Sequence, residues 1–184
     1  MRIIRGEFSG KSLIPPTSLL TRPTSDKVRQ AIFNVVENNS EMPELRGSSV
    51  LDAFAGTGSL GLEALSRGAE HAVFIDNQRA ACKNIQRLLE QWGAKDRATI
   101  MTHDIQTIAT TTIPLDFVFC DPPYGKNLVN IGVNHLCKQG WIDSNTTIIA
   151  EMHKHDTLSL YVDFTVLQDK KYGDTRVVFF KVCL

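Results

Sequence analysis

Val50-Leu51-Asp52-Ala53-Phe54-Ala55-Gly56-Thr57-Gly58-Ser59-Leu60-Gly61 passes from an apolar run through a glycine-rich turn into a helical pattern. Its glycines match G-x-G-x-x-G in the strand–turn–helix context that this motif requires. Glycine is needed where a backbone meets a ligand, because no Cβ can intrude there. The motif alone fits a nicotinamide dinucleotide, S-adenosylmethionine or a tight turn without a ligand.

Strands and helices alternate on both sides of this segment. Apolar runs predict strands at 49–54, 72–75, 98–101, 115–120 and 147–150. Helical periodicity predicts helices at 25–38, 60–67, 78–92 and 128–138. The chain then changes pattern, with two strands at 161–167 and 176–182 around a turn at 171–174. This order predicts an α/β fold with a mostly parallel sheet, helices on both faces and an antiparallel strand at the C-terminal end.

The composition is that of one globular domain with a short extension. The chain has 184 residues, of which 42% are hydrophobic and 22% charged, and it contains no apolar run of about 18 residues that could span a bilayer. The N-terminus lacks the apolar core of a secretion signal, so we expect a cytoplasmic protein. The four cysteines are far apart and lie in apolar or helical stretches, so we interpret them as core residues and expect no metal site.

Charge is unevenly distributed along the chain. The net charge is zero, yet residues 1–30 hold six basic and two acidic side chains, which leaves +4 there and −4 on the rest. Residues 1–23, broken by glycine and proline, predict a basic arm or hairpin ahead of a domain at 24–184. The asymmetry favours an anionic partner at the arm, although a solvated charged face gives the same pattern.

Three carboxylates lie at the ends of successive predicted strands. Asp76 lies 20 residues after Gly56, where it can accept hydrogen bonds from ribose hydroxyls. Asp52 discriminates better between cofactors, because its charge attracts the ammonium and sulfonium of S-adenosylmethionine and repels a pyrophosphate. Asp104 could contact an adenine amino group. The carboxyl ends of parallel strands are where such folds bind ligands.

Asp121-Pro122-Pro123-Tyr124 directly follows the fourth predicted strand. The prolines stiffen the loop before any substrate arrives. An exocyclic base amine is a poor nucleophile, and the Asp121 carboxylate and the Pro122 carbonyl could accept its N–H bonds while the base stacks on Tyr124. A rigid turn with Tyr124 packed on the core is the alternative.

With these motifs the chain resembles class I S-adenosylmethionine-dependent methyltransferases that carry [DN]-P-P-[YF], and among them the bacterial 16S ribosomal RNA guanine-N2 methyltransferases. The closer resemblance covers nearly the whole chain. It rests on the residues at 2–6, 10–11, 22–29, 31–34, 51–61 and 121–124.

The resemblance implies a Rossmann-like, seven-stranded sheet with the last strand antiparallel. It also implies methylation of a guanine N2 in 16S ribosomal RNA, or in an assembling small subunit, by a monomeric enzyme that uses S-adenosylmethionine and no metal. The implied cofactor contacts are Asp52, Phe54, Gly56, Gly58, Asp76, Asn77, Asp104 and Ile105. The implied catalytic loop is Asp121, Pro122, Pro123 and Tyr124, and the implied RNA contacts are Arg5, Lys11 and Arg22.

Other functions remain open at this point. A protein glutamine-N5 methyltransferase would share the later motifs but not the basic arm, and a DNA adenine-N6 methyltransferase would need a target-recognition domain that is not visible. A nicotinamide-dependent oxidoreductase would leave Asp52 and the 121–124 loop unexplained. A non-catalytic RNA-binding module would not need Asp121 and Tyr124.

Overall fold

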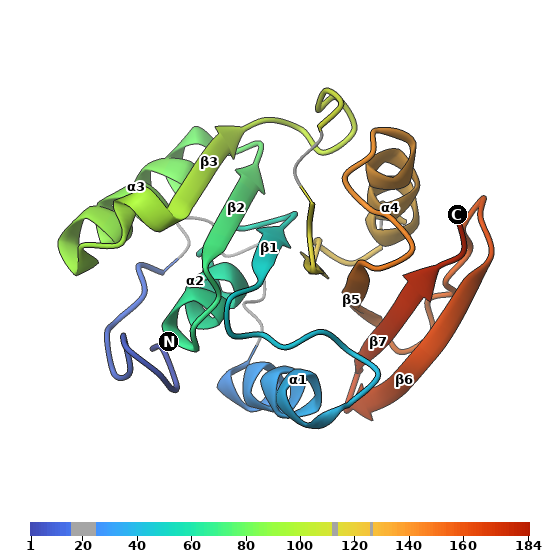
Figure 1. Ribbon diagram of the computed structural model, residues 1–184, viewed down its shortest axis with the longest axis horizontal. Helices are drawn as coiled ribbons and strands as arrows, with labels where there is room; N and C mark the ends of the chain where they lie inside the picture. The colour runs from blue at the N-terminus through green and yellow to red at the C-terminus, as the bar shows by residue number, and fades with distance from the viewer. Residues whose placement is uncertain (16–24, 112–113, 126) are drawn as a thin grey trace.

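The computed structural model describes residues 1–15, 25–111, 114–125 and 127–184, and its centre is a seven-stranded sheet (Figure 1). The strands lie in the order β3-β2-β1-β4-β5-β7-β6. Their bounds are β1 (Ser49–Asp52), β2 (His71–Asp76), β3 (Ala98–Thr102), β4 (Phe117–Cys120), β5 (Thr147–His153), β6 (Phe164–Tyr172) and β7 (Thr175–Val182). The first five strands are parallel and β7 is antiparallel to both of its neighbours, which confirms the predicted sheet.

Helices cover both faces of the sheet, as predicted. They are α1 (Asp26–Asn38), α2 (Ser59–Ser66), α3 (Arg79–Trp92) and α4 (Leu128–Lys138), with a short 3-10 helix η1 (Lys95–Arg97). Alternate residues of each strand point to opposite faces. Phe117 and Phe119 of β4 therefore pack with α1, α2 and α3, and Val118 packs with α4. Within the described ranges, no helix is both long and apolar enough to cross a bilayer.

Several strand boundaries differ from the sequence prediction, and for two of them the hydrogen bonds show the reason. We expected the first strand to reach Phe54, but β1 ends at Asp52. Ala53 N still continues the pairing with β4 by donating to Phe119 O, and the backbone then turns so that Ala55 N donates to Ile75 O of β2, both at 2.9 Å. We also expected a strand from residue 161, but β6 begins at Phe164. Tyr161 N donates instead to the Asn134 side chain of α4 at 2.9 Å.

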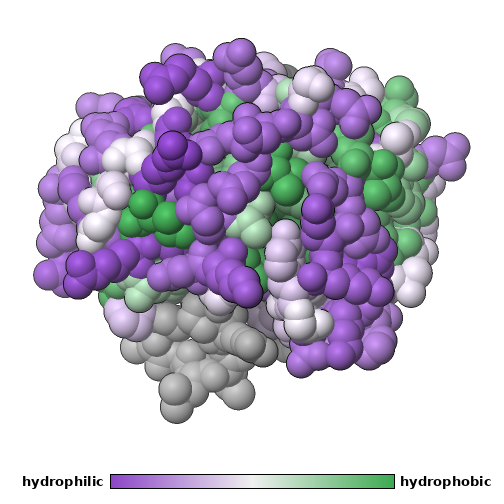
Figure 2. Space-filling model, turned by 90° about the horizontal axis from the view of Figure 1, so that it is seen from below, coloured by the Kyte–Doolittle hydropathy of each residue, from purple (hydrophilic) through white to green (hydrophobic). Residues whose placement is uncertain are grey.

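The N-terminal residues pack against the domain. Arg2 pairs with Ser12 in an antiparallel bridge, which makes residues 1–15 a small hairpin. Three apolar side chains of this hairpin are buried in the core beside α1, α2 and α3: Ile3, Phe8 and Leu13. Figure 2 looks at the molecule from the side of α1 and this hairpin, and most of that face is hydrophilic. Residues 16–24 of the expected arm lie outside the described residues.

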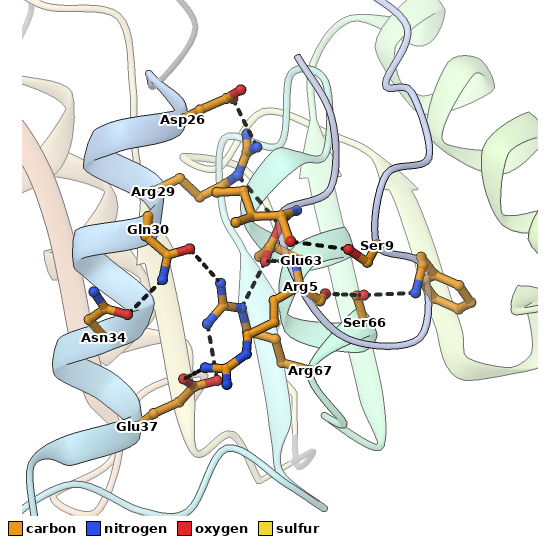
Figure 3. A network of polar contacts seen from close by, with 12 residues as sticks. Arg5, Ser9, Asp26, Arg29, Gln30, Asn34, Glu37, Glu63, Ser66 and Arg67 are labelled. Atoms are coloured by element: carbon orange, nitrogen blue, oxygen red, sulfur yellow. Dashed lines mark hydrogen bonds and ion pairs between the residues drawn. The ribbon is translucent and has the colours of Figure 1, made fainter.

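A buried carboxylate fastens the hairpin to the domain (Figure 3). Glu63 of α2 is fully buried and accepts hydrogen bonds from Ile4 N at 2.8 Å and Arg5 N at 3.1 Å. The same carboxylate accepts from Arg67 Nε at 2.8 Å and lies 3.6 Å from Arg29 Nε. Arg29 is also fully buried, so one of the six basic residues counted at 1–30 adds nothing to the basic surface.

Candidate active site

The glycine-rich turn joins β1 to α2, and each of its three glycines has its own physical reason. Gly56 and Gly58 have positive φ values of 53° and 73°, which side chains rarely adopt. A Cβ on Gly58 would lie 2.9 Å from Ile85, and one on Gly61 would lie 2.3 Å from the Phe74 ring. A Cβ on Gly56 would meet only Phe54 O within 4 Å, so the space above Gly56 is open.

Two carboxylates hold this turn in shape from neighbouring strands. Asp52 Oδ2 accepts from Gly61 N at 2.9 Å, at the start of α2. Asp76 Oδ2 accepts from Gly56 N at 2.8 Å, and its Oδ1 accepts from Gln78 N at 2.7 Å. Both side chains therefore contact the glycine-rich turn by hydrogen bonds to its backbone.

Asp52 is the carboxylate with the more unusual electrostatic environment. Burial raises its pKa to about 7, the Gly61 amide lowers it, and the nearby Asp76 carboxylate raises it further. A buried, partly protonated acid is stabilised in its charged form by a neighbouring cation. The turn is therefore suited to a cationic ligand and opposes an anionic one.

The remaining expected cofactor contacts follow β2 and β3 or lie in the turn itself. Asn77 is exposed directly after Asp76, and Asp104 Oδ1 accepts from Gln106 N at 2.9 Å. Phe54 and Ile105 both face α4, because a Cβ on Gly132 would lie 3.2 Å from the Phe54 ring and 3.7 Å from Ile105. All of these residues lie at the carboxyl edge of the parallel strands.

The 121–124 loop continues from β4 at this same edge. Tyr124 is held at its hydroxyl, which lies 3.0 Å from Glu151 Oε1 and 2.9 Å from Thr175 Oγ1. Burial and Glu151 both raise the pKa of Tyr124, while Thr175 lowers it, so the phenol stays protonated and donates to the carboxylate. The ring also meets His153 edge-on, with centroids 5.9 Å apart.

A cavity of about 270 Å³ opens beside Tyr124. Its walls come from the 121–124 loop, the start of α4 and the end of β5, and include Pro122, Tyr124, Asn127, Glu151 and Met152. This volume is near the lower end of the range for small-molecule pockets, roughly 300–1,000 Å³. A flat ring that enters the cavity would lie beside Tyr124 and Glu151, which both line it.

Direct backbone bonds join the glycine-rich turn to the strand that carries the 121–124 loop. β1 and β4 are neighbours with Asp52 opposite Phe119, and the Ala53 N to Phe119 O bond extends that pairing into the turn. Tyr124 and Gly56 therefore lie on the same edge of the sheet.

The expected RNA contacts lie elsewhere. The hairpin contacts the C-terminal end of α2 through the Glu7 N to Ser66 O bond and the end of α3 through Phe8 and Trp92. Both helices run back from the carboxyl ends of the parallel strands. The hairpin, which carries Arg5 and Lys11, therefore lies toward the amino ends of these strands (Figure 1). Arg22 lies outside the described residues.

Glu151 and Thr175 are site residues that the sequence analysis missed. Glu151 had a readable signal, since it is a lone acid in the apolar run Ile148–Met152 and is only 6% exposed. Thr175 had none, because its place beside Tyr124 depends on the pairing of β7 with β5. Over the part of the chain that the structure describes, no three His, Cys, Asp or Glu side chains group to hold a metal ion.

Comparisons with known proteins give consistent results. A family model described as "Conserved hypothetical protein 95" matches residues 1–181. The "Putative rRNA methyltransferase YlbH" of Bacillus subtilis is 31% identical over 98% of both chains. The "Ribosomal RNA small subunit methyltransferase D" of Haemophilus influenzae is 32% identical over 94% of this chain and 89% of its own. The solved structure of "Putative methyltransferase yhhF" from Escherichia coli superposes with a TM-score of 0.85 at 29% identity, covering 99% of this chain and 97% of its own.

Proposed function

Because this chain belongs to the family described as Conserved hypothetical protein 95, we propose that it transfers a methyl group from S-adenosylmethionine to the exocyclic N2 of a guanine in 16S ribosomal RNA. The relatives named as ribosomal RNA small subunit methyltransferases support the reaction class and the RNA substrate. The observation that carries the proposal is the joining of the glycine-rich turn to the end of β4 through Ala53 N and Phe119 O.

The residues of the turn fit S-adenosylmethionine. In the proposal Asp52, Phe54, Gly56 and Gly58 hold the methionine end, Asp76 and Asn77 the ribose, and Asp104 and Ile105 the adenine. The raised pKa of Asp52 supports a cationic ligand at the turn, and the open space above Gly56 leaves room for one. When bound, S-adenosylmethionine supplies an electrophilic methyl group on a sulfonium, and this chemistry needs no metal.

The 121–124 loop does the work on the acceptor. The guanine ring stacks on Tyr124, whose hydroxyl is fixed by Glu151 and Thr175 so that the ring keeps one orientation. The Asp121 carboxylate and the Pro122 carbonyl accept the two N–H bonds of N2 and increase electron density on the nitrogen. Transfer would form the N–CH₃ bond and break the S–CH₃ bond of the cofactor, leaving a neutral thioether. The nitrogen would give up one proton, and Asp121 is the base proposed to receive it.

We further propose that residues 1–23 act as a basic arm and residues 24–184 as the methyltransferase domain, in a cytoplasmic monomer. Arg5, Lys11 and Arg22 are the arm residues proposed to contact RNA phosphates. The substrate is free 16S ribosomal RNA or an assembling small subunit.

The test is methyl transfer from methyl-labelled S-adenosylmethionine to small ribosomal subunits that lack the modification. Mass spectrometry of the digested RNA should find one new N2-methylguanosine. Labelling of a protein instead of RNA would favour a protein glutamine-N5 methyltransferase. Methyl-adenine in DNA would favour a DNA adenine-N6 methyltransferase. Either result contradicts the proposal.

A further inference from the structure

The outer face of α3 carries a row of basic side chains. Arg79, Lys83 and Arg87 follow one another at four-residue spacing, which places them on one side of the helix. All three are exposed, whereas the opposite side buries Cys82, Ile85, Leu88 and Leu89. None of the three cations has a hydrogen bond or an ion pair with another described residue.

This charge arrangement works against the stability of the helix. Like charges four residues apart repel each other. In addition, the first turn of α3 contains Arg79 and no acid, and its last turn contains Glu90 and no basic residue. Cations near the N-terminus and anions near the C-terminus are both unfavourable to the helix dipole. Stability of the isolated helix therefore does not explain the row.

Glu90 is the acid on the same face, and other residues engage it. Gln86 Nε2 donates to Glu90 Oε1 at 3.0 Å, and Lys95 Nζ lies 3.5 Å from the same oxygen. The pKa of Glu90 is lowered, first by Gln86 and then by Lys95. Across residues 77–97 five basic and two acidic side chains leave a local charge of +3.

Among the residues that the structure describes, α1, α2 and α4 lack such a row. The exposed charged residues of α1 are of both signs, with Asp26 and Glu37 acidic and Lys27 basic, and Arg29 is buried. Lys138 is the single lysine or arginine of α4, and α2 is buried along its whole length. Of the four α-helices, α3 is thus the one that carries a row of exposed basic side chains.

The row connects the candidate active site to the N-terminal hairpin. α3 starts three residues after Asp76, at the carboxyl edge, and ends at Trp92, whose ring centroid lies 5.2 Å from that of Phe8. Lys11 Nζ sits over both rings, 4.8 Å from the Phe8 centroid and 5.3 Å from the Trp92 centroid. From Arg79 to Arg87 the helix rises about 12 Å. Figure 1 shows α3 at the outer side of the sheet with the hairpin beneath its end.

We propose that the exposed face of α3 binds the phosphate backbone of the RNA substrate and guides it between the hairpin and the catalytic edge. The inference rests on the proposed function and adds a second RNA-binding element to the arm. These cations have no anionic partner among the described residues, and RNA phosphates would supply one. The counterions that the RNA then releases make such binding strongly salt-dependent. Because phosphate contacts carry no sequence information, the face positions the RNA and does not select the guanine.

The experiment measures binding of the full chain to a fluorescent 16S ribosomal RNA fragment by anisotropy over a salt series. Lys83→Gln with Arg87→Gln should weaken binding roughly tenfold or more at 0.1 M salt. The double substitution should also reduce the slope of log affinity against log salt by about 1 for each lost contact. The dissociation constant for S-adenosylmethionine should stay unchanged, because neither residue lies at the glycine-rich turn.

The matched control is Lys170→Gln with Lys171→Gln on β6. It removes the same charge from the outermost strand at the other side of the sheet from β3. It should keep both affinity and salt slope. An α3 variant that binds RNA like the wild type, or a control that weakens binding equally, overturns the proposal. An α3 variant that loses binding to anionic phosphatidylserine vesicles but still binds RNA also overturns it, because α3 would then bind a membrane surface. Wild-type protein that binds RNA without methylating it contradicts the proposed function alone, since binding and transfer are measured separately.

Discussion

The Tyr124 hydroxyl donates a 3.0 Å hydrogen bond to Glu151 Oε1, and this bond ties the loop after β4 to the neighbouring strand β5. Tyr124→Ala should remove the stacking surface, which contributes about 1–3 kcal/mol per base, and raise the KM for RNA by roughly 5-fold to 150-fold. Tyr124→Phe keeps the ring and should lower kcat only several-fold.

A double-mutant cycle tests whether Glu151 acts through the Tyr124 hydroxyl. Glu151→Gln should lower kcat in the wild type and have little further effect when Tyr124 is already Phe, because the shared bond is then absent. Steady-state kinetics on undermethylated small subunits measure both. Additive losses would show that Glu151 acts independently of Tyr124.

Asp121 should matter for the chemical step and not for cofactor affinity. Asp121→Ala removes the acceptor that we propose for the N–H bonds of the nucleophile, so kcat should fall by about 10²–10³, the usual loss for one such group. Asp121→Asn is the matched comparison, since it keeps the shape and one acceptor but not the charge. Calorimetry should give an unchanged S-adenosylmethionine dissociation constant for both. Full activity of the Asn variant would remove the base from the mechanism.

The affinity for S-adenosylmethionine should rise with pH because of Asp52. Its folded pKa of about 7 exceeds the ordinary 3.8, so the protonated form is favoured, and its contribution to stability is lost as pH rises toward 7. A bound cation reverses that preference and releases a proton, so affinity should increase about tenfold from pH 6 to pH 8. Asp52→Asn should flatten the profile in calorimetry. A wild-type profile that is flat or falls with pH would contradict the role given to Asp52.

Glu63 should be the most costly carboxylate to remove. Glu63→Ala leaves the buried Arg29 and Arg67 without their shared acceptor, and breaking such a buried pair costs about 3–5 kcal/mol. The exposed Glu90→Ala should change the free energy of unfolding by less than about 0.5 kcal/mol. Urea denaturation compares the two. Limited proteolysis should also cut residues 1–15 faster in the Glu63 variant, because Ile4 N and Arg5 N lose their acceptor.

Periodicity and strand order were enough to predict the parallel sheet and its hairpin, because each element is encoded locally. Helix α4 was predicted with the same ends, Leu128 and Lys138, that the structure has. The end of β5 was not, since Glu151 and Met152 extend the strand only by pairing with Val177 and Arg176. The same non-local pairing explains why Thr175 could not be found beside Tyr124.

The charged residues were harder to interpret from the sequence. Arg29 and Lys27 look alike there, yet Arg29 is buried against Glu63 and Lys27 is exposed. Burial of an ion depends on a partner 34 residues away, which composition cannot reveal. The row on α3 could have been seen as a four-residue spacing, but only the structure shows that its cations form no ion pair with another described residue.

β7 is an interior strand of the sheet although it comes after all six others in the chain. During synthesis, the edge of β5 therefore stays open, with unpaired amides and carbonyls, until β7 has left the ribosome tunnel. Since Thr175 belongs to β7, Tyr124 also lacks one of its two anchors until then. A nascent chain can form the strands around the glycine-rich turn early. The 121–124 loop gains its full support, and the protein its activity, only when the β6–β7 hairpin has formed.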